Sequence, residues 1–403
     1  MIELDDLRRS PNPLSRHYSR FRVADRLLLT GHSHQAWPDI ATEGQLRAFE
    51  DAAEAVDAKW ERAFGKADRV RAGFRALLDD PSGELALGAS THDLVIRFLS
   101  ALDLRRRPRL VTTDGEFHTL RRQLARLAEE GVELVRIPAS PAGTLAARCA
   151  DAVDHRTAAV LVSAVLFETA RIVPGLDQLA AACQHDGAEL LVDAYHALGV
   201  VPFSLRVSGL GDAWVVGGGY KYLQLGEGNC FLRLPAHADR LRPVITGWFA
   251  EFAALADDHQ SEQVGYGHGG ARFAGSTYDP TSHYRAVSVF EFFDAHGLTP
   301  ARLRRVSRHQ VELLANRFDE LGIPDDVVTR DRRTPLDAFG GFLALRSRYA
   351  TVLQQALAAR GVSTDSRGAF LRFGPAPYLS DAQLDEAMAA LGETAKDVAQ
   401  NAT

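Results

Sequence analysis

Two short apolar runs in the middle of the chain, each followed by a polar residue, constrain the fold most. Residues 190–192 form the first run, which stops at Asp193. The second run, 213–216, enters a triple glycine and is followed by Lys221. Apolar runs of this length, bounded by turn residues, predict buried strands. Because ligands in open α/β sheets bind outside the carboxyl ends of strands, an acid and a lysine at two such ends predict one shared site.

Lysine is rare in this sequence, which draws attention to Lys221. The chain has 46 lysines and arginines together, and four of them are lysines. Lys59 and Lys66 lie in a charged segment with a helical pattern, and Lys396 lies in the polar C-terminal part. Arginine stays protonated, whereas a partly buried lysine can lose its proton near neutral pH. The pattern therefore favours a reactive amine at Lys221 over a lysine whose stem merely covers apolar surface.

The residues around this lysine resemble a known cofactor site. Segments 193–196 (Asp-Ala-Tyr-His) and 220–223 (Tyr-Lys-Tyr-Leu), with the Gly-x-Gly loop 226–228, are similar to the pyridoxal-phosphate (PLP) site of class V aminotransferase-fold enzymes. Within that group they are most similar to kynureninases. The resemblance implies that Lys221 binds PLP covalently and that Asp193 pairs with the pyridine nitrogen and keeps it protonated. A protonated pyridine ring is what makes this cofactor an electron sink.

A second cofactor element is predicted near residue 90. The apolar run 85–88 is followed by Ser90 and Thr91 and then by a helical pattern. A helix N-terminus binds anions because its free N–H groups and its dipole point at the ligand. Ser90 and Thr91 also fit ordinary helix N-caps. The family resemblance favours the anion site, because it places the cofactor phosphate at this turn.

The resemblance implies further cofactor contacts. Phe117 follows the apolar run 110–113 and falls where kynureninases stack a phenylalanine on the pyridoxal ring. The implied contacts are Ser90, Thr91, Phe117, Ser163, Asp193, His196, Tyr220 and Lys221, while Trp248 and Ser276 would reach the phosphate of the neighbouring subunit. The chain is therefore expected to form a homodimer with shared active sites.

The expected substrate contacts come from other parts of the chain. Arg372 lies in a segment similar to the small-domain strand whose arginine binds the substrate α-carboxylate in kynureninases, and its planar fork suits a carboxylate; a surface salt bridge is the alternative. Gly275 stands where some kynureninases have a substrate-contacting asparagine. His32 and His34 are further candidates, although loop histidines without a ligand role fit equally well. No metal site is predicted, since no carboxylate or cysteine follows these histidines at ligand spacing.

The resemblance implies an α/β fold of the fold-type I PLP-dependent transferase architecture. It comprises a large domain with a mostly parallel seven-stranded sheet and a smaller C-terminal α+β domain. The expected divisions are an N-terminal segment at 1–50, which contributes to the small domain and the site mouth, a large PLP-binding domain at 51–280 and a small domain at 281–403. Alternating apolar strands and helical patterns independently predict a largely parallel sheet.

Composition limits the partners. The net charge is −6 and the 42 arginines (46 minus four lysines) are spread along the chain, which argues against nucleic acid. No apolar run reaches membrane-spanning length. The three cysteines lack metal-type spacing and are odd in number, so a reduced, cytoplasmic setting is expected.

The predicted function is that of a PLP-dependent enzyme acting on a β-substituted α-amino acid by kynureninase-like hydrolytic cleavage of the Cβ–Cγ bond. Alternatives are cleavage of a C–S bond or decarboxylative or oxidative deamination of an S-substituted cysteine, transamination, and a non-catalytic scaffold. Leu120 and Gly275 depart from the kynureninase pattern at the substrate end. Plain kynurenine is therefore predicted to be a poor substrate, and the substrate side chain stays open because a fold does not define it.

Overall fold

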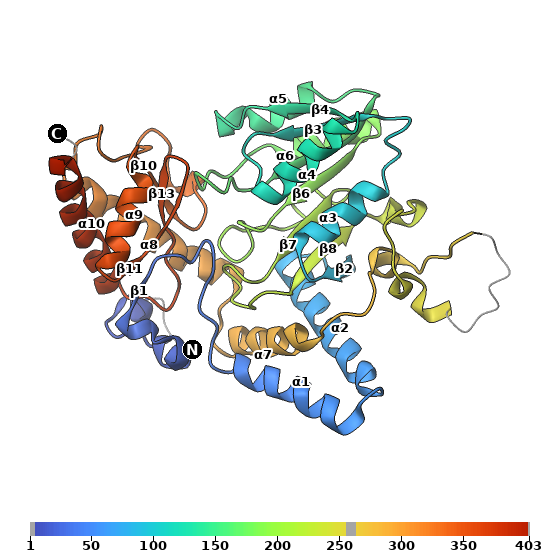
Figure 1. Ribbon diagram of the computed structural model, residues 1–403, viewed down its shortest axis with the longest axis horizontal. Helices are drawn as coiled ribbons and strands as arrows, with labels where there is room; N and C mark the ends of the chain where they lie inside the picture. Colours follow the sequence, from blue (N-terminus) through green and yellow to red (C-terminus); the bar gives the residue numbers. More distant parts are fainter. Residues whose placement is uncertain (1–4, 255–262, 402–403) are drawn as a thin grey trace.

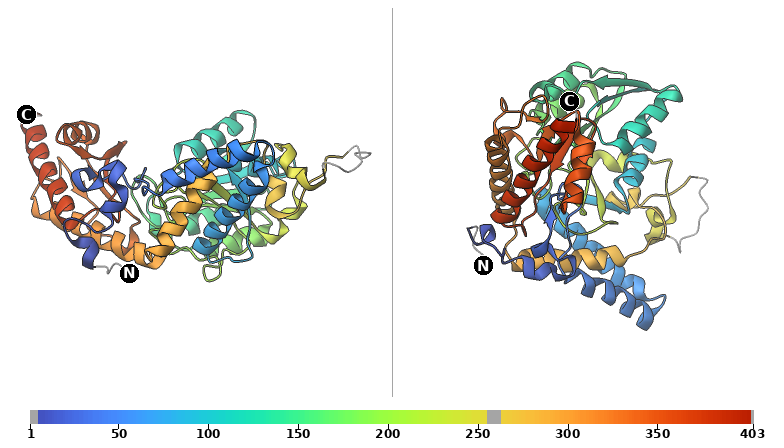
Figure 2. Two further views of the ribbon diagram at one scale, coloured as in Figure 1. Left: turned by 90° about the horizontal axis from the view of Figure 1, so that it is seen from below. Right: turned by 60° about the vertical axis from the view of Figure 1, so that its left-hand side comes forward.

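The computed structural model describes residues 5–254 and 263–401, which form two lobes (Figure 1). The larger lobe is built on a seven-stranded sheet, and the smaller lobe combines a four-stranded sheet with helices near the C-terminus. Residues 5–28 of the N-terminal segment lie against the smaller lobe (Figure 2), whereas the helix that follows packs on the larger lobe. Within the described ranges, none of the helices combines the length and the apolar character needed to cross a bilayer.

The large sheet has the strand order β2-β8-β7-β6-β5-β3-β4. Its strands are β2 (Glu84–Gly88), β3 (Arg109–Thr113), β4 (Glu133–Ile137), β5 (Thr157–Ser163), β6 (Glu189–Asp193), β7 (Trp214–Gly218) and β8 (Cys230–Leu234). Strand β8 is antiparallel to both of its neighbours, and the other pairs are parallel. The carboxyl ends of the six other strands therefore share one edge. The predicted mostly parallel, seven-stranded sheet is confirmed.

Both faces of this sheet are covered by helices, which explains why its strands are continuous apolar runs. Along β5, Val160 and Val162 belong to one hydrophobic cluster, whereas Ala159 and Leu161 belong to another. Helices α3 (Thr91–Ser100) and α4 (His118–Glu129) contribute to the second cluster, and α2 (Lys59–Leu78), α5 (Leu145–Asp151) and α6 (Leu176–Asp186) contribute to the first. The rigid sheet between two cores gives the site a fixed edge.

The charged segment with a helical pattern that contains Lys59 and Lys66 is helix α2, and a separate helix precedes it. Helix α1 (Ala41–Ala55) ends at Val56, whose φ of 48° reverses the chain before α2 begins. A β-branched residue with positive φ is unusual, so the pattern of apolar residues gave no sign of this break. Helix α7 (Thr281–Ala295) packs against both α1 and α2. The expected domain boundary at 281 thus falls at the start of a helix that packs on the larger lobe, and the boundary stays a prediction.

The smaller lobe contains an antiparallel sheet of order β12-β13-β10-β9. Its elements are β9 (Thr329–Arg330), β10 (Leu343–Arg346), β12 (Asp365–Arg367) and β13 (Phe370–Phe373), with α8 (Pro300–Glu320), α9 (Ala350–Ala359) and α10 (Asp381–Asn401). Strand β1 (Leu27–Leu28) pairs in parallel with β11 (Val362–Ser363), and Thr30 bridges to Gly374. This pairing carries the loop with His32 to the junction of the lobes.

Candidate active site

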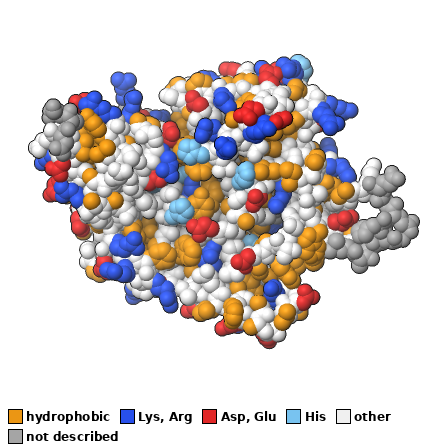
Figure 3. Space-filling view, viewed as in Figure 1, with side chains coloured by type: hydrophobic (Ala, Val, Ile, Leu, Met, Phe, Trp, Pro, Cys, Tyr) orange, Lys and Arg blue, Asp and Glu red, His pale blue; other side chains and the backbone are white. Residues whose placement is uncertain are grey.

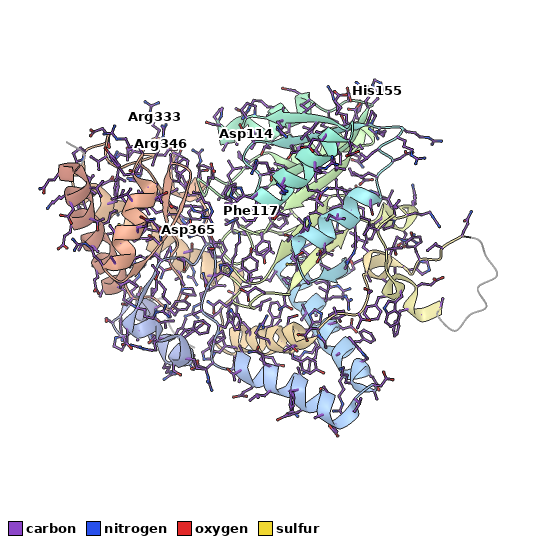
Figure 4. The ribbon with its side chains drawn as sticks, viewed as in Figure 1. Asp114, Phe117, His155, Arg333, Arg346 and Asp365 are labelled. Atoms are coloured by element: carbon purple, nitrogen blue, oxygen red, sulfur yellow. The ribbon has the colours of Figure 1, made fainter. Side chains whose placement is uncertain are left out.

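Four of the predicted residues meet near the carboxyl edge of the large sheet. Asp193 ends β6, Ser163 ends β5 directly opposite it in the ladder, and Lys221 follows β7 by three residues. Phe117 lies just past β3. Figure 4 shows that Phe117 of the larger lobe and Asp365 of the smaller lobe both lie where the two lobes face each other. The site is therefore formed between the lobes, at the edge expected for an α/β sheet.

Lys221 is buried, with 6% of its surface exposed, and its Nζ lies 2.7 Å from Nε2 of His196. The amine also faces the ring of Tyr195, whose centroid is 4.9 Å away, and the ring of Phe117 at 5.4 Å. Burial lowers the pKa of Lys221 to about 7, although the nearby Asp193 carboxylate opposes this shift. The amine can therefore be neutral and nucleophilic near neutral pH, as the sequence predicted.

The triple glycine before Lys221 allows the chain to pass close to its neighbours. A Cβ on Gly218 would approach the hydroxyl oxygen of Tyr195 to 2.5 Å, closer than a carbon atom can sit without displacing the ring. The Tyr195 ring in turn packs on Tyr220, with ring centroids 4.8 Å apart. The absence of side chains at the end of β7 thus lets two aromatic rings and the lysine share one small region.

Asp193 lines a small cavity and interacts electrostatically with Lys221. Its Oδ1 accepts a hydrogen bond from the backbone N–H of Tyr195 at 2.8 Å. Burial raises the pKa of Asp193, while the Lys221 amine opposes the rise. The cavity is lined by the side chains of Asp193 and Phe117 and by Thr91 at the start of α3, among others. An acid, an aromatic ring and a helix N-terminus thus surround one space.

Ser90 is the N-cap of α3, and its Oγ accepts a hydrogen bond from the N–H of Asp93 at 3.2 Å. The cap that the sequence left open as an alternative is therefore present. Capping by Ser90 uses one of the free N–H groups of the first turn, and the others stay available to an anion. Phosphate binding at Ser90 and Thr91 stays a prediction.

Sequence reasoning missed the buried carboxylate of Glu116, next to Phe117. Its two oxygens accept hydrogen bonds from the hydroxyl of Thr113 at 2.6 Å, the hydroxyl of Ser163 at 2.6 Å and the N–H of Ser163 at 3.2 Å. Burial raises the pKa of Glu116 to about 7, against these hydrogen bonds, and Asp193 adds to the rise. A glutamate three residues past the end of a buried strand and directly before an aromatic residue was the available signal.

Arg372 is buried rather than on the surface, and it is already paired. Its Nε and Nη2 both donate to Oδ1 of Asp365, with the Nε bond at 2.8 Å, and its Nη1 donates to the carbonyl of Phe167 at 2.5 Å. His32 lies beside this pair, with its Nε2 3.8 Å from the same Asp365 oxygen. The predicted residues His32 and Arg372 thus come together through Asp365, which the sequence had not placed in the site.

His34, two residues further on, has a different environment. Its ring stacks on Tyr220 at a centroid distance of 4.7 Å, and its Nε2 lies 3.6 Å from a carboxylate oxygen of Glu227. The side chain is exposed. His34 therefore lies at the outer side of Tyr220, and His32 is the histidine of this loop that is enclosed.

Trp248, Gly275 and Ser276 lie in a different region of the larger lobe. The N–H of Phe249 donates to the carbonyl of Gly275 at 3.1 Å, which holds the two segments together. Trp248 is 44% exposed and packs on Phe249, with ring centroids 4.3 Å apart. The structure thus joins these predicted residues to one another on an exposed surface, away from the lysine. Their predicted role toward a neighbouring subunit is not tested by one chain.

The strand-end residues fit the cofactor that the family resemblance implies. Phe117 offers a ring face, Asp193 a carboxylate and α3 a helix N-terminus around one cavity, and Lys221 offers a neutral amine 5.4 Å from the Phe117 ring centroid. These are the groups that a pyridine ring, an aldehyde and a phosphate require. By contrast, no group of three or more potential metal ligands is found in residues 5–254 and 263–401.

Comparison with solved structures identifies the fold. The chain superposes on a lysine-to-alanine mutant of C-DES with glycine covalently linked to the PLP cofactor (TM-score 0.80, 15% identity, 94% of this chain and 98% of that chain). It also superposes on the apo cysteine desulfurase of Thermococcus onnurineus NA1 (TM-score 0.80, 16% identity, 96% and 99%). A third match is the cystine C–S lyase C-DES in complex with its reaction product cysteine persulfide (TM-score 0.78, 15% identity, 92% and 98%).

The chain has the α/β fold of fold-type I PLP-dependent enzymes. The coverage of both chains is nearly complete, so the predicted fold class is confirmed across the whole molecule. No protein-family model matches the sequence, and no curated protein is similar to it. None of the three structures is a kynureninase, so the finer resemblance to that family is not confirmed.

Proposed function

We propose that this protein is a PLP-dependent enzyme that cleaves the Cβ–S bond of a sulfur-containing α-amino acid. The observation that carries the proposal is the buried Lys221 amine, 2.7 Å from His196, beside the cavity lined by Phe117 and Asp193. The structural neighbours named as a cysteine desulfurase and a cystine C–S lyase support sulfur chemistry over Cβ–Cγ hydrolysis. Cβ–S cleavage was one of the alternatives that the sequence left open.

The larger lobe supplies the groups that would hold the cofactor. Lys221 would bind it covalently, Asp193 would pair with the pyridine nitrogen, Phe117 would stack on the ring and the α3 N-terminus at Ser90 and Thr91 would bind the phosphate. When bound, PLP supplies an electron sink for a carbanion at the substrate Cα. Departure of a sulfur group from Cβ then needs no further activation by a metal.

Lys221 is also the group best placed to move the Cα proton. Once a substrate amine had taken its place on the cofactor, the Lys221 amine would be free, and its lowered pKa of about 7 would let Nζ accept and return a proton near neutral pH. His196 lies within hydrogen-bond distance of this atom, so it can hold the amine in position between these steps. His196 is itself buried, and its pKa is lowered by burial and by the charge of Lys221, so it acts as a neutral partner.

The cysteines favour a lyase over a sulfur transfer to the protein. A protein thiol can accept sulfur only as a reachable thiolate. The three cysteines of the sequence, Cys149, Cys183 and Cys230, are all buried, and burial raises the pKa of each thiol to about 12. A β-elimination, in which the sulfur group leaves the substrate as a thiol or persulfide, needs no protein thiol. We therefore place the chain closer to a C–S lyase in its chemistry.

A substrate panel tests this proposal. The holoenzyme is incubated separately with cystine, cysteine, S-methylcysteine, alanine and kynurenine, and products are identified by mass. Pyruvate, ammonia and a thiol or persulfide are expected from at least one sulfur substrate. The expected kcat/KM for that substrate is at least about tenfold above the value for kynurenine, because one mismatched polar group in a pocket already costs that factor. Release of alanine and anthranilate from kynurenine at the higher rate would instead restore the kynureninase hypothesis.

We also propose that the enzyme is a homodimer whose sites use residues of both subunits. Val244, Ile245, Trp248 and Phe252 are exposed large apolar side chains within nine residues of one another. Figure 3 shows apolar side chains gathered on the larger lobe toward the lower right of that view. Exposed apolar clusters of this kind mark interaction surfaces. Trp248 and Ser276 would reach the partner's cofactor phosphate from this surface.

Mixed dimers test the shared site. Trp248→Ala and Lys221→Ala should each be inactive or weak alone, whereas a purified heterodimer should regain activity in one of its two sites. Analytical ultracentrifugation of the wild type should show a dimer. A monomer, or a verified heterodimer without regained activity, would contradict the shared site while leaving the C–S chemistry untouched.

A further inference from the structure

His32 is enclosed between the lobes with its hydrogen-bonding capacity unused. None of its surface is exposed, and neither Nδ1 nor Nε2 has a hydrogen-bond partner among the residues that the structure describes. The nearest carboxylate oxygen, Oδ1 of Asp365, is 3.8 Å from Nε2 and thus beyond hydrogen-bond distance. Buried polar groups without partners are rare in native proteins, and each one needs an explanation.

The position of the ring is fixed by its surroundings. The ring of Phe342 packs on it at a centroid distance of 4.6 Å. Gly374 lies directly against it, and a Cβ on that residue would collide with Nδ1. The N–H of Gly31 donates to the carbonyl of Gly374 at 2.7 Å, which holds the loop in place. His32 therefore cannot swing away to find another partner, and the unused nitrogens are a property of the folded site.

The groups that face His32 are mostly charged. Asp365 lies between the guanidinium of Arg372 and that of Arg367, whose Nη2 is 3.5 Å from its Oδ2. Lys221 and His196 lie on the side of the larger lobe and interact electrostatically with His32. With a neutral His32, one carboxylate thus stands against two guanidinium groups. The region can accept one more negative charge.

We propose that His32 takes up a proton when a substrate carboxylate binds beside Arg372, and that the resulting imidazolium donates a hydrogen bond to this carboxylate. The inference rests on the proposed function, since it assigns the anchoring end of the same amino acid. Arg372 keeps N–H donors that Asp365 does not use, and His32 supplies the donor that is missing on the other side. The substrate carboxylate would join Asp365 as a second anion between these groups.

The electrostatics of the free protein support this assignment. Burial lowers the pKa of His32 to about 4, Asp365 raises it, and Arg372 and Lys221 lower it further. The ring is therefore neutral when the subsite is free. A carboxylate placed beside it stabilises the imidazolium form and raises the pKa. A proton from solvent then converts the imidazole to imidazolium as the anion binds, so the subsite gains a negative and a positive charge together.

Calorimetry of the holoenzyme with propionate tests the proposal without any turnover. Titrations at about pH 6 in PIPES and in Bis-Tris, which differ in ionisation enthalpy, give the number of protons taken up per ligand bound. Uptake of more than about half a proton is expected, because a neighbouring carboxylate shifts a buried histidine by several pKa units. The affinity should fall as pH rises. Propionamide, which is neutral, should bind without proton uptake.

Variants locate the proton. His32→Gln should retain propionate binding with an affinity lowered by about tenfold, the loss of one charged hydrogen bond, and should take up no proton. His155→Gln, an exposed histidine at the far end of the larger lobe (Figure 4), should behave as the wild type. Circular dichroism verifies that each variant is folded. Absence of proton uptake in the wild type would overturn the proposal, whatever the stability of the variant. Proton uptake by folded His32→Gln equal to that of the wild type would overturn it as well.

The outcome separates this inference from the proposed function. Proton-coupled propionate binding that depends on His32, in an enzyme that releases no sulfur product, would support the subsite and reject C–S cleavage. Release of a sulfur product by an enzyme that binds propionate without proton uptake would reject the role of His32 and leave the C–S chemistry in place.

Discussion

Two groups of buried polar side chains lie near the site, one in the larger lobe and one where the smaller lobe meets it, and they differ in how fully their hydrogen bonds are formed. In the larger lobe, the carboxylate of Glu116 accepts three hydrogen bonds from Thr113 and Ser163. The second group consists of His32, Asp365 and Arg372. Arg372 and Asp365 are paired, but neither ring nitrogen of His32 has a hydrogen-bond partner among the described residues. The first group is internally complete, and the second is not.

The difference matches the parts that the two groups would play. A cofactor is the same in every turnover, so residues around it can be held in one arrangement by neighbours that satisfy them. A substrate arrives and leaves, and the residues that bind it need donors that stay free in between. An unpaired buried donor costs about 1–3 kcal/mol, and the rest of the fold must offset that cost. The unsatisfied side is therefore where ligand binding has the most free energy to gain.

The largest expected effect is on the lysine between the two groups. Lys221→Ala removes both the covalent attachment of the cofactor and the amine that moves the Cα proton. Turnover should fall by about 10⁴-fold or more, since one residue serves both steps. Borohydride reduction of the wild type should attach a pyridoxyl group to the peptide with Lys221. Lys66→Ala is the matched control and should retain full activity; labelling at Lys59, Lys66 or Lys396 would refute the assignment.

The next prediction distinguishes the two arginines beside Asp365 in the smaller lobe. Arg372→Lys keeps the positive charge beside Asp365 but loses the planar fork, so KM should rise by about 10²-fold with a smaller change in kcat. Arg367→Lys is the control, because Arg367 is exposed and lies 3.5 Å from the other oxygen of Asp365. Its KM should change less than about twofold, as for other exposed ion pairs. Equal KM values for both variants would contradict a carboxylate site at Arg372.

The residues at the strand ends were predictable from the sequence, whereas the hydrogen-bond partners within each of the two polar groups were not. Asp193 and Lys221 lie at the ends of apolar runs, and the ends of parallel strands meet by geometry. The signals for these residues are local. The sheet and its direction followed from the same alternation of strands and helices. Local pattern therefore predicted the mostly parallel sheet and the closeness of Asp193 and Lys221, while the roles of these residues toward the cofactor stay predictions.

The remaining features depend on contacts between distant segments. The pairing of β1 with β11 brings His32 to Asp365 and Arg372 from the other end of the chain. A salt bridge between Asp365 and Arg372 within neighbouring strands left no trace in the periodicity of either. Glu116 was passed over because glutamate is rarely buried, and Ser163, which donates to it from the end of β5, lies 47 residues away in the sequence. Each of these features becomes visible only when strand register is known.

The smallest expected effect is on stability, and it comes from Glu116 in the fully hydrogen-bonded group of the larger lobe. Its pKa is raised to about 7 in the folded protein, from a usual value of 4.5. The folded state therefore holds this proton more tightly than the unfolded chain, and the contribution to stability is present below about pH 4.5 and is lost as pH rises through 7. A shift of this size corresponds to roughly 3 kcal/mol.

Glu116→Gln resembles the protonated side chain at every pH. The variant should unfold in urea with a free energy within about 1 kcal/mol of the wild type at acidic pH, since the amide keeps one acceptor for Thr113 or Ser163. It should become the more stable protein at alkaline pH, because the wild type then carries a buried charge that the variant lacks. Glu168→Gln, in a nearby loop, is the control, and its free energy of unfolding should equal that of the wild type at both acidic and alkaline pH. Parallel stability curves for Glu116→Gln and the wild type would show that the three hydrogen bonds fully offset the burial of the charge, and that Glu116 stays ionised throughout.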